Sequence, residues 1–110
     1  MLRNFPESDW KTLSRLKPLV LERLCRRILV DAAGIIARAQ EVGQHRAYLD
    51  LYRHIHERDE ILSRCFDEWK RSRALETLIN WRAEHLLTDE EFAAFSPETR
   101  RIVEMLLKRD

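Results

Sequence analysis

Apolar residues recur at helical spacing in the first half of the chain. They follow one another at alternating intervals of four and three residues, which is the spacing of a heptad seam on one side of a helix. The members of this seam are Leu21, Cys25, Ile28, Ala32, Ile35, Ala39 and Val42. They predict a long helix over residues 18–42. The residues that widen its apolar side are Leu24, Leu29, Val30 and Ile36. A single neighbouring helix does not cover so wide a side.

The seam resumes after Gly43, a residue that suits the end of a helix because it takes left-handed backbone conformations easily. Its members here are Tyr48, Leu51, Ile55, Leu62, Cys65 and Trp69. They predict a second long helix over 45–72. Two long helices joined at a glycine turn predict an antiparallel hairpin over 19–72.

Shorter helices are predicted on both sides of the hairpin. Ser8 or Asp9 can cap a short first helix, and Pro18 either kinks that helix or begins the next one. After the hairpin, leucine and isoleucine at helical spacing predict a helix over 73–87. The sequence leaves open whether that helix continues the preceding one or follows a break near Ser72.

Two start signals divide the last part of the chain. Thr88 and Glu91 have the spacing of a capping box, which predicts that a short helix begins at Thr88. Ser96 followed by Pro97 combines a capping residue with a first-turn proline, and it predicts a final helix that reaches about Lys108.

Composition strengthens the helical prediction. The 110 residues are 45% hydrophobic and 35% charged and include two glycines and three prolines, which leaves little room for the turns of a β-sheet. We therefore expect an all-α helical bundle that forms one domain over 1–110, with the long hairpin over 19–72 and C-terminal helices over 73–110. Because the hairpin is longer than its short neighbours can cover, we also expect a symmetric homodimer.

Charge is unevenly distributed, although the formal net charge is only +1. Residues 1–40 have eight Lys or Arg and four Asp or Glu, a net of +4, whereas 83–98 have five acidic residues and no Lys or Arg, a net of −5. A basic cluster on the outward side of the first long helix is a candidate interaction surface. It consists of Arg15, Lys17, Arg23, Arg26 and Arg27. No aromatic residue is interleaved for base stacking, so nucleic acid is the second choice of partner.

Arg58 stands where the seam of the second long helix calls for an apolar residue. In a hairpin that turns at 43–44, Arg58 lies opposite the segment 29–31. One interpretation is a contact with Asp31 that fixes the register of the two helices. The other is that the Arg58 side chain reaches solvent along its aliphatic stem.

Residues that commonly bind metals or catalyse reactions do not form a recognisable pattern. His54 and His56 are two residues apart on a predicted helix and therefore point to different sides. Cys25 and Cys65 lie on predicted buried stripes, where we expect free thiols that act as small apolar residues. With no nucleophile–base pair, phosphate loop or metal-ligand spacing, we expect neither an enzyme nor a bound cofactor or metal.

The tryptophans are expected in the core or at helix junctions. Trp69 lies on the seam and should be buried. The pattern does not decide the place of Trp81. If Trp81 were exposed together with Phe92 or Phe95, these rings would mark a groove for a partner.

The segments Phe5-Pro6-Glu7-Ser8-Asp9-Trp10-Lys11 and Leu86-Leu87-Thr88-Asp89-Glu90-Glu91-Phe92 together resemble those of a family of small, uncharacterised bacterial proteins that are all helical. The resemblance implies a bacterial source and no particular activity. The polar N-terminus, the lack of a long apolar segment and the two cysteines lead us to expect a cytoplasmic protein.

These features lead to two expectations about function. The first is a protein-interaction adaptor or regulator that binds through a helix face and forms a homodimer. The alternative is a nucleic-acid-binding accessory protein that uses the basic helix surface.

Overall fold

A computed structural model of the chain describes residues 5–108. Over this range it contains helices and connecting turns and no β-strand, so the all-α fold class is confirmed. The helices are α1 (Glu7–Ala37), α2 (Ala39–Val42), α3 (Gln44–Phe66), the 3-10 helix η1 (Arg71–Arg73), α4 (Ala74–Ala83), α5 (Asp89–Ala93) and α6 (Pro97–Lys108). None of the helices in this range has the length and apolar character that a membrane span would need.

The first two predicted helices are one continuous helix, α1, with Pro18 inside it. A proline in a helix removes a backbone hydrogen bond and costs about 3 kcal/mol or more. Leu13, Leu16 and Val20, which flank Pro18, are all buried in the same core, and this packing keeps the helix intact. The alternative in which Pro18 begins a new helix is therefore wrong. So is the predicted cap, because the N-cap position of α1 is Pro6, which makes no side-chain hydrogen bond.

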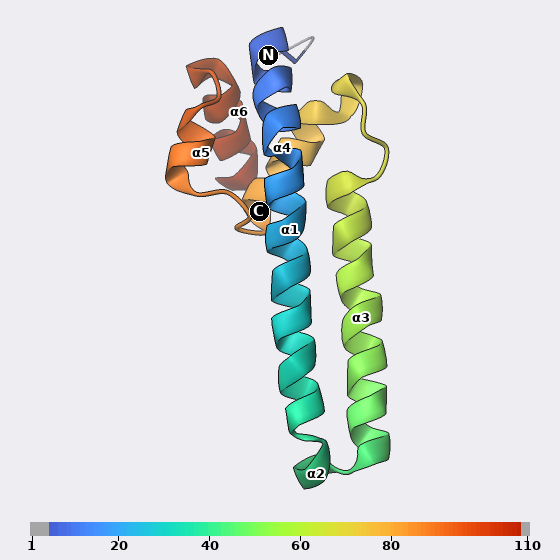
Figure 1. Cartoon of the computed structure of the whole chain (residues 1–110). Coiled ribbons are helices and arrows are strands. Elements are labelled where there is room, and N and C mark those ends of the chain that lie inside the picture. Colours follow the sequence, from blue (N-terminus) through green and yellow to red (C-terminus); the bar gives the residue numbers. More distant parts are fainter. Residues whose placement is uncertain (1–4, 109–110) are drawn as a thin grey trace.

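Helices α1 and α3 lie side by side and run in opposite directions, with α2 at the turn between them (Figure 1). Gly43 ends α2 with φ 100° and ψ 145°, a conformation that favours glycine. Near this turn Ala32 and Ala47 are buried, and their small side chains let the two helices approach closely. The pair extends well beyond the other helices. The radius of gyration is accordingly 16.9 Å, compared with about 13 Å for a compact domain of this length.

The second long helix is shorter than predicted, since α3 ends at Phe66 and not at residue 72. Asp67 has extended backbone angles and Glu68 has a positive φ of 54°, so the chain leaves the helix here. The break allows Trp69 to turn back towards the other helices. Its ring centroid lies 5.4 Å from that of Trp10 and 6.0 Å from that of Trp81. Trp69 is therefore half-buried in a cluster of rings, and it does not continue the seam.

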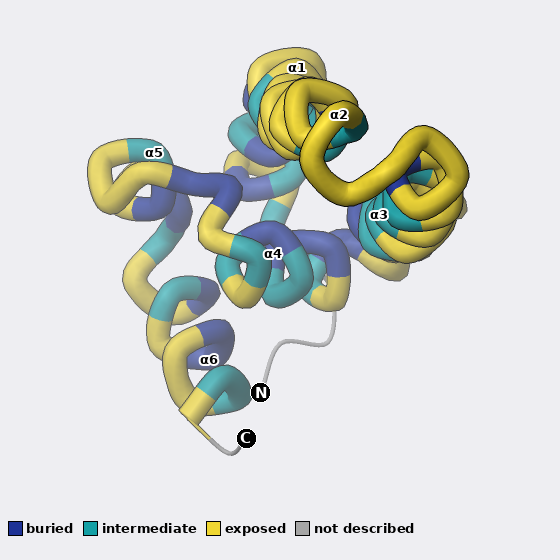
Figure 2. The backbone as a smooth tube through the Cα atoms, turned by 90° about the horizontal axis from the view of Figure 1, so that it is seen from below, coloured by how far each residue is buried: buried dark blue, intermediate teal, exposed yellow. Residues whose placement is uncertain are grey.

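Helices α4, α5 and α6 pack around the first part of α1 and form the main core of the molecule. We call this region the base; it comprises residues 5–24 and 63–108. The largest of its side chains that are almost completely buried are Leu13, Val20, Leu78, Trp81, Leu86, Phe95 and Val103. We call the remainder, residues 25–62, the arm. Figure 2 shows the contrast: the inward sides of the base are buried, whereas most of the arm is exposed.

Both predicted start signals in the C-terminal part are confirmed. Thr88 accepts a hydrogen bond from the Glu91 amide at 3.1 Å, and the Glu91 carboxylate accepts one from the Thr88 amide at 2.9 Å. Helix α6 begins at Pro97, directly after Ser96.

The start of α6 is held by a residue from the opposite end of the chain. The buried carboxylate of Asp9 accepts hydrogen bonds from the Ser96 amide (2.8 Å), the Ser96 hydroxyl (2.7 Å) and the Thr99 hydroxyl (2.6 Å). Asp9 therefore accepts hydrogen bonds at the N-terminus of α6, and it does not cap its own helix.

Candidate protein-interaction face

Exposed apolar side chains are concentrated in the arm. Ten large apolar side chains of the described residues are exposed, and eight of them belong to residues 25–62. They are Leu29, Val30, Ile36, Val42, Tyr48, Leu49, Tyr52 and Ile55. The largest exposed fractions are those of Leu29 (66%), Tyr52 (64%) and Tyr48 (63%). Such a concentration in one region is typical of a surface that is covered by a partner.

Many of these residues share one side of the helix pair. A groove between α1 and α3 is lined by Cys25, Ile28, Leu29, Ile55, Asp59 and Leu62. Ile36 lies two turns after Leu29 on α1, and Tyr48 and Tyr52 lie seven and three residues before Ile55 on α3, so they extend the same side. We call this surface the arm face. Its members are Cys25, Leu29, Ile36, Tyr48, Tyr52, Ile55, Asp59 and Leu62.

The base lies on the other side of the arm. In the view along the arm, α4, α5 and α6 all lie on one side of the α1 and α3 pair, and apart from α2 at the turn no helix of residues 5–108 lies on the opposite side (Figure 2). A second hollow, which includes Glu84 of the base in its lining, also contains Asp31 and Arg58. The arm face is therefore open to solvent along its whole length.

Asp31 and Arg58 lie near each other in this hollow, but they form no ion pair among the contacts of the described residues. Arg58 is half-buried and Asp31 is exposed. The contact that joins the two helices at this level comes from His54, whose Nε2 donates to the carbonyl oxygen of Ile28 at 3.1 Å. The proposed register pair is thus not formed. The His54 contact was not predicted, because only the relative position of the two helices shows that Ile28 is within reach.

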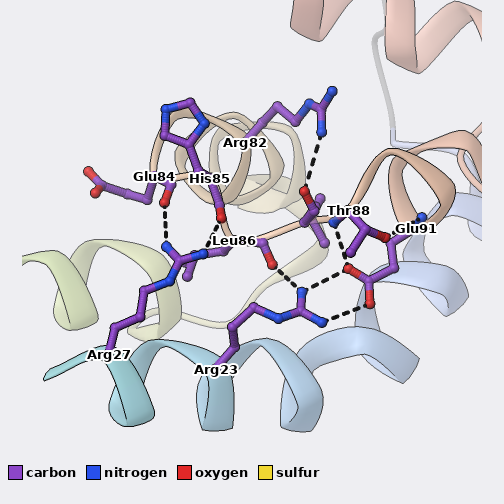
Figure 3. Close-up of polar contacts among 9 residues, drawn as sticks. Arg23, Arg27, Arg82, Glu84, His85, Leu86, Thr88 and Glu91 are labelled. Carbon is purple, nitrogen blue, oxygen red and sulfur yellow. Dashed lines mark hydrogen bonds and ion pairs between the residues drawn. The ribbon is translucent and has the colours of Figure 1, made fainter. Parts of the chain in front are cut away.

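The basic cluster of α1 does not form one outward surface, since two of its members face the chain itself (Figure 3). Arg23 donates to both carboxylate oxygens of Glu91, at 2.8 and 3.1 Å, and to the carbonyl oxygen of Leu86. Arg27 donates to the carbonyl oxygens of Glu84 and His85. These carbonyl groups belong to the turn that follows α4, so the two arginines hold this turn against α1.

The Arg23–Glu91 pair also shifts the pKa values of both groups. The hydrogen bonds to Arg23 lower the pKa of the Glu91 carboxyl, and those to Glu91 raise the pKa of the Arg23 guanidinium. Lys17 is engaged as well, with its Nζ 4.3 Å from the centroid of the Trp69 ring, at cation–π distance. Of the predicted basic surface, Arg15 and Arg26 remain as exposed residues without such contacts among the described residues. Arg23 is half-buried and not on the outward side, whereas Arg27 is exposed although its guanidinium contacts the turn after α4.

The rings that could have marked a groove are in the core. Trp81, Phe92 and Phe95 are all buried, so they offer no surface to a partner. The Trp81 indole donates to the carbonyl oxygen of Cys65 at 3.0 Å. Burial, together with the nearby Glu84 carboxylate, raises the pKa of the Cys65 thiol to about 11. Cys25, in contrast, is half-buried on the arm face, and both cysteines are free thiols.

Among residues 5–108 there is no group of three or more His, Cys, Asp or Glu side chains placed to hold a metal ion. The chain matches none of the known family models, curated proteins or solved structures with which it was compared. The resemblance to small bacterial helical proteins therefore stays a prediction, and function is argued from the arm face.

Proposed function

We propose that this protein is an interaction adaptor or regulator that binds another protein through the arm face. The observation that carries this proposal is the concentration of eight exposed large apolar side chains in the arm. Leaving such a surface in water is unfavourable, because each apolar Å² that becomes buried contributes about 25 cal/mol. The proposal treats the long antiparallel hairpin of α1 and α3 as the binding platform and the base as its support.

The chemistry of the arm face suits a helical protein partner. Two apolar stripes run along neighbouring helices, and such a surface accepts the apolar side of one or two further helices. Tyr48 and Tyr52 add large rings with a polar tip, and tyrosine is enriched at protein interfaces. A cytoplasmic location and the lack of an enzymatic activity are parts of the same proposal.

The alternative, binding of nucleic acid by the basic surface of α1, has less support. Arg23 and Arg27 are engaged with α4 and the turn after it, and Arg15 and Arg26 alone are a small electrostatic footprint. A surface of this size would show a weak dependence of binding on salt concentration.

The proposal is tested by capture of partners from a cell extract of the native host, with matched substitutions on the two regions. Ile55→Glu places a charge on the arm face, and Met105→Glu places one on an exposed apolar position of the base. We expect a defined protein to be captured by the wild type and by Met105→Glu and to be lost with Ile55→Glu.

Capture that is unaffected by Ile55→Glu would contradict the proposal. Capture of nucleic acid that is lost when Arg15 and Arg26 are replaced by serine would instead support the alternative. Circular dichroism of both glutamate variants provides the control for folding.

A further inference from the structure

We propose that the arm face binds the arm face of a second copy of this chain, in a symmetric dimer whose twofold axis runs along the arm. In this dimer α1 of each copy lies on α3 of the other, and Arg26 of each copy pairs with Asp59 of the other. The inference rests on the proposed function and narrows it, because the protein that binds the arm face is then a second copy of this chain.

The chain exposes more surface than a compact monomer of its mass. The solvent-accessible surface of the chain is 7705 Å², whereas a compact monomer of 13.2 kDa exposes about 6,400 Å². The excess of about 1,300 Å² is larger than the roughly 800 Å² that each partner contributes to a standard interface. A second copy can therefore cover the excess without any change in the base.

The arm face also has a self-complementary shape. It consists of two adjacent helices, each with an apolar stripe at heptad spacing, which is half of a four-helix bundle. A symmetric dimer needs one surface that fits itself, and two such layers placed face to face provide it. The base lies on the far side of the arm in each copy, so it does not obstruct this contact (Figure 2).

Two charged residues at the edges of the arm face favour one arrangement of the two copies. Arg26 lies in line with Val30 and Ala33 on the outer edge of α1, beyond Leu29. These residues line a shallow hollow on the surface of α1. Asp59 lies on the corresponding flank of α3, at the rim of the apolar groove. Both side chains are exposed, and neither has an ion pair among the described residues.

The two charges also lie at one level of the arm. Leu29 and Ile55 line the same groove, and Arg26 and Asp59 are each about one helical turn nearer to the base. A twofold axis parallel to the arm leaves each residue at the same height along the arm. It places the outer edge of α1 in one copy against the outer edge of α3 in the other, so the dimer contains two equivalent Arg26–Asp59 pairs. An arrangement with α1 on α1 in opposite directions would separate these charges.

The test is the oligomeric state of the purified protein, measured by sedimentation equilibrium at tens of micromolar. We expect twice the mass of 13.2 kDa for the wild type and for Met105→Glu, and the monomer mass for Ile55→Glu. A monomeric wild type would overturn the inference. If that monomer still captured a protein through an intact Ile55, the proposed function would survive the loss of this inference.

The arrangement is tested by exchanging the charges. Arg26→Asp and Asp59→Arg should each raise the dissociation constant of the dimer about fivefold or more, because each places like charges together. The double variant, with both changes, should return it to near the wild-type value. A dimer in which the double variant is as weak as the two single changes combined would overturn the proposed arrangement.

Cys25 offers an independent measure of whether the face is covered. It is half-buried in the single chain and should be shielded in the dimer, whereas Cys65 is buried in the base in both states. A thiol reagent should therefore modify Cys25 at least tenfold faster in Ile55→Glu than in the wild type at the same concentration. Equal rates would contradict a contact at this face.

Discussion

The base and the arm are built from the same types of residue, yet they differ in how much of their apolar surface is buried. In the base, Leu13, Leu78 and Trp81 have no exposed surface. In the arm, the only buried residues are Ala32 and Ala47, whereas leucine, isoleucine and tyrosine side chains stay in solvent. A helix pair has only one internal seam, so apolar residues beyond that seam are buried only if a further layer is added. The base contains that layer within the chain, and the arm does not.

The polar contacts of the two regions differ in the same way. The base is closed by the Asp9 network and by the bidentate Arg23–Glu91 pair, which join distant parts of the chain. Within the arm, the hydrogen bond of His54 is the one side-chain hydrogen bond between α1 and α3 among the described residues. Stability should therefore be concentrated in the base.

The same substitution in both regions gives the largest expected difference. Leu78→Ala opens a cavity in the base and should reduce the free energy of unfolding by about 2–5 kcal/mol. Leu29→Ala removes an exposed side chain of the arm and should change it by no more than about 0.5 kcal/mol. Urea unfolding followed by circular dichroism, at a dilution where the protein is monomeric, measures both. Equal losses would show that Leu29 is buried within the single chain.

The Asp9 network is expected to have the next largest effect. Asp9→Ala leaves the Ser96 amide and two hydroxyl groups in the base without their acceptor, and should reduce the free energy of unfolding by about 1–3 kcal/mol. Ser8→Ala, at the exposed neighbouring position, is the control and should have little effect. The same urea titration applies. A loss for Ser8→Ala as large as that for Asp9→Ala would contradict the assignment of the network.

Two glycines of the arm should respond in opposite directions. Gly43 has a φ of +100°, which side chains rarely adopt, so Gly43→Ala should destabilise the protein by about 1–3 kcal/mol. Gly34 lies within α1 with open space around its Cα, so Gly34→Ala should stabilise it by about 0.5–1 kcal/mol. Thermal unfolding of the two variants gives the signs directly. Stabilisation by Gly43→Ala would mean that the turn has another conformation.

The smallest expected effect is a dependence of base stability on pH. Arg23 lowers the pKa of Glu91 below its ordinary value of 4.5, so the pair stabilises the folded chain above that pH. This contribution is lost as the pH falls through the lowered pKa. Glu91→Gln should therefore reduce stability at neutral pH, and its difference from the wild type should shrink as the pH falls below 4.5.

Glu90→Gln is the matched control for this pH effect, because Glu90 is an exposed neighbour on the same helix. The measurement compares the urea midpoints of the two variants and the wild type between neutral pH and about pH 3, a range that spans the ordinary carboxyl pKa. A difference for Glu91→Gln that stays constant with pH would exclude the ionised pair as its cause.

Local signals in the sequence predicted those parts of the fold that depend on local contacts. The capping box at Thr88 and the Ser96-Pro97 start are satisfied by residues within one turn, and both were predicted correctly. Pro18 and the end of α3 were predicted less well. Both depend on packing between distant segments. Packing keeps α1 continuous through Pro18, and it favours a break after α3 that places Trp69 beside Trp10.

The candidate site shows the same limit. Leu29 and Ile36 already stood out because they widen an apolar side, but Tyr52 was missed, since it lies outside the main seam. Tyr52 and Asp59 fall between the seam residues Tyr48, Ile55 and Leu62. The five residues together repeat at intervals of four and three, and this repeat was the available signal. The partners of Arg23 and Arg27 lie about 60 residues away along the chain, so helical spacing alone could not indicate that these arginines contact the chain itself.

The hydrogen bonds of Asp9 also have a consequence for the order of folding. They join residues 87 and 90 positions apart, whereas the His54 contact in the arm spans 26. Closing a longer loop costs more entropy before any contact forms, so distant contacts tend to form late. During synthesis, α1 and α3 can pair as soon as both have left the ribosome. The hydrogen bonds of Asp9 can form only after Thr99 has been made. The least buried part of the molecule can thus form first, and its most stable part closes last.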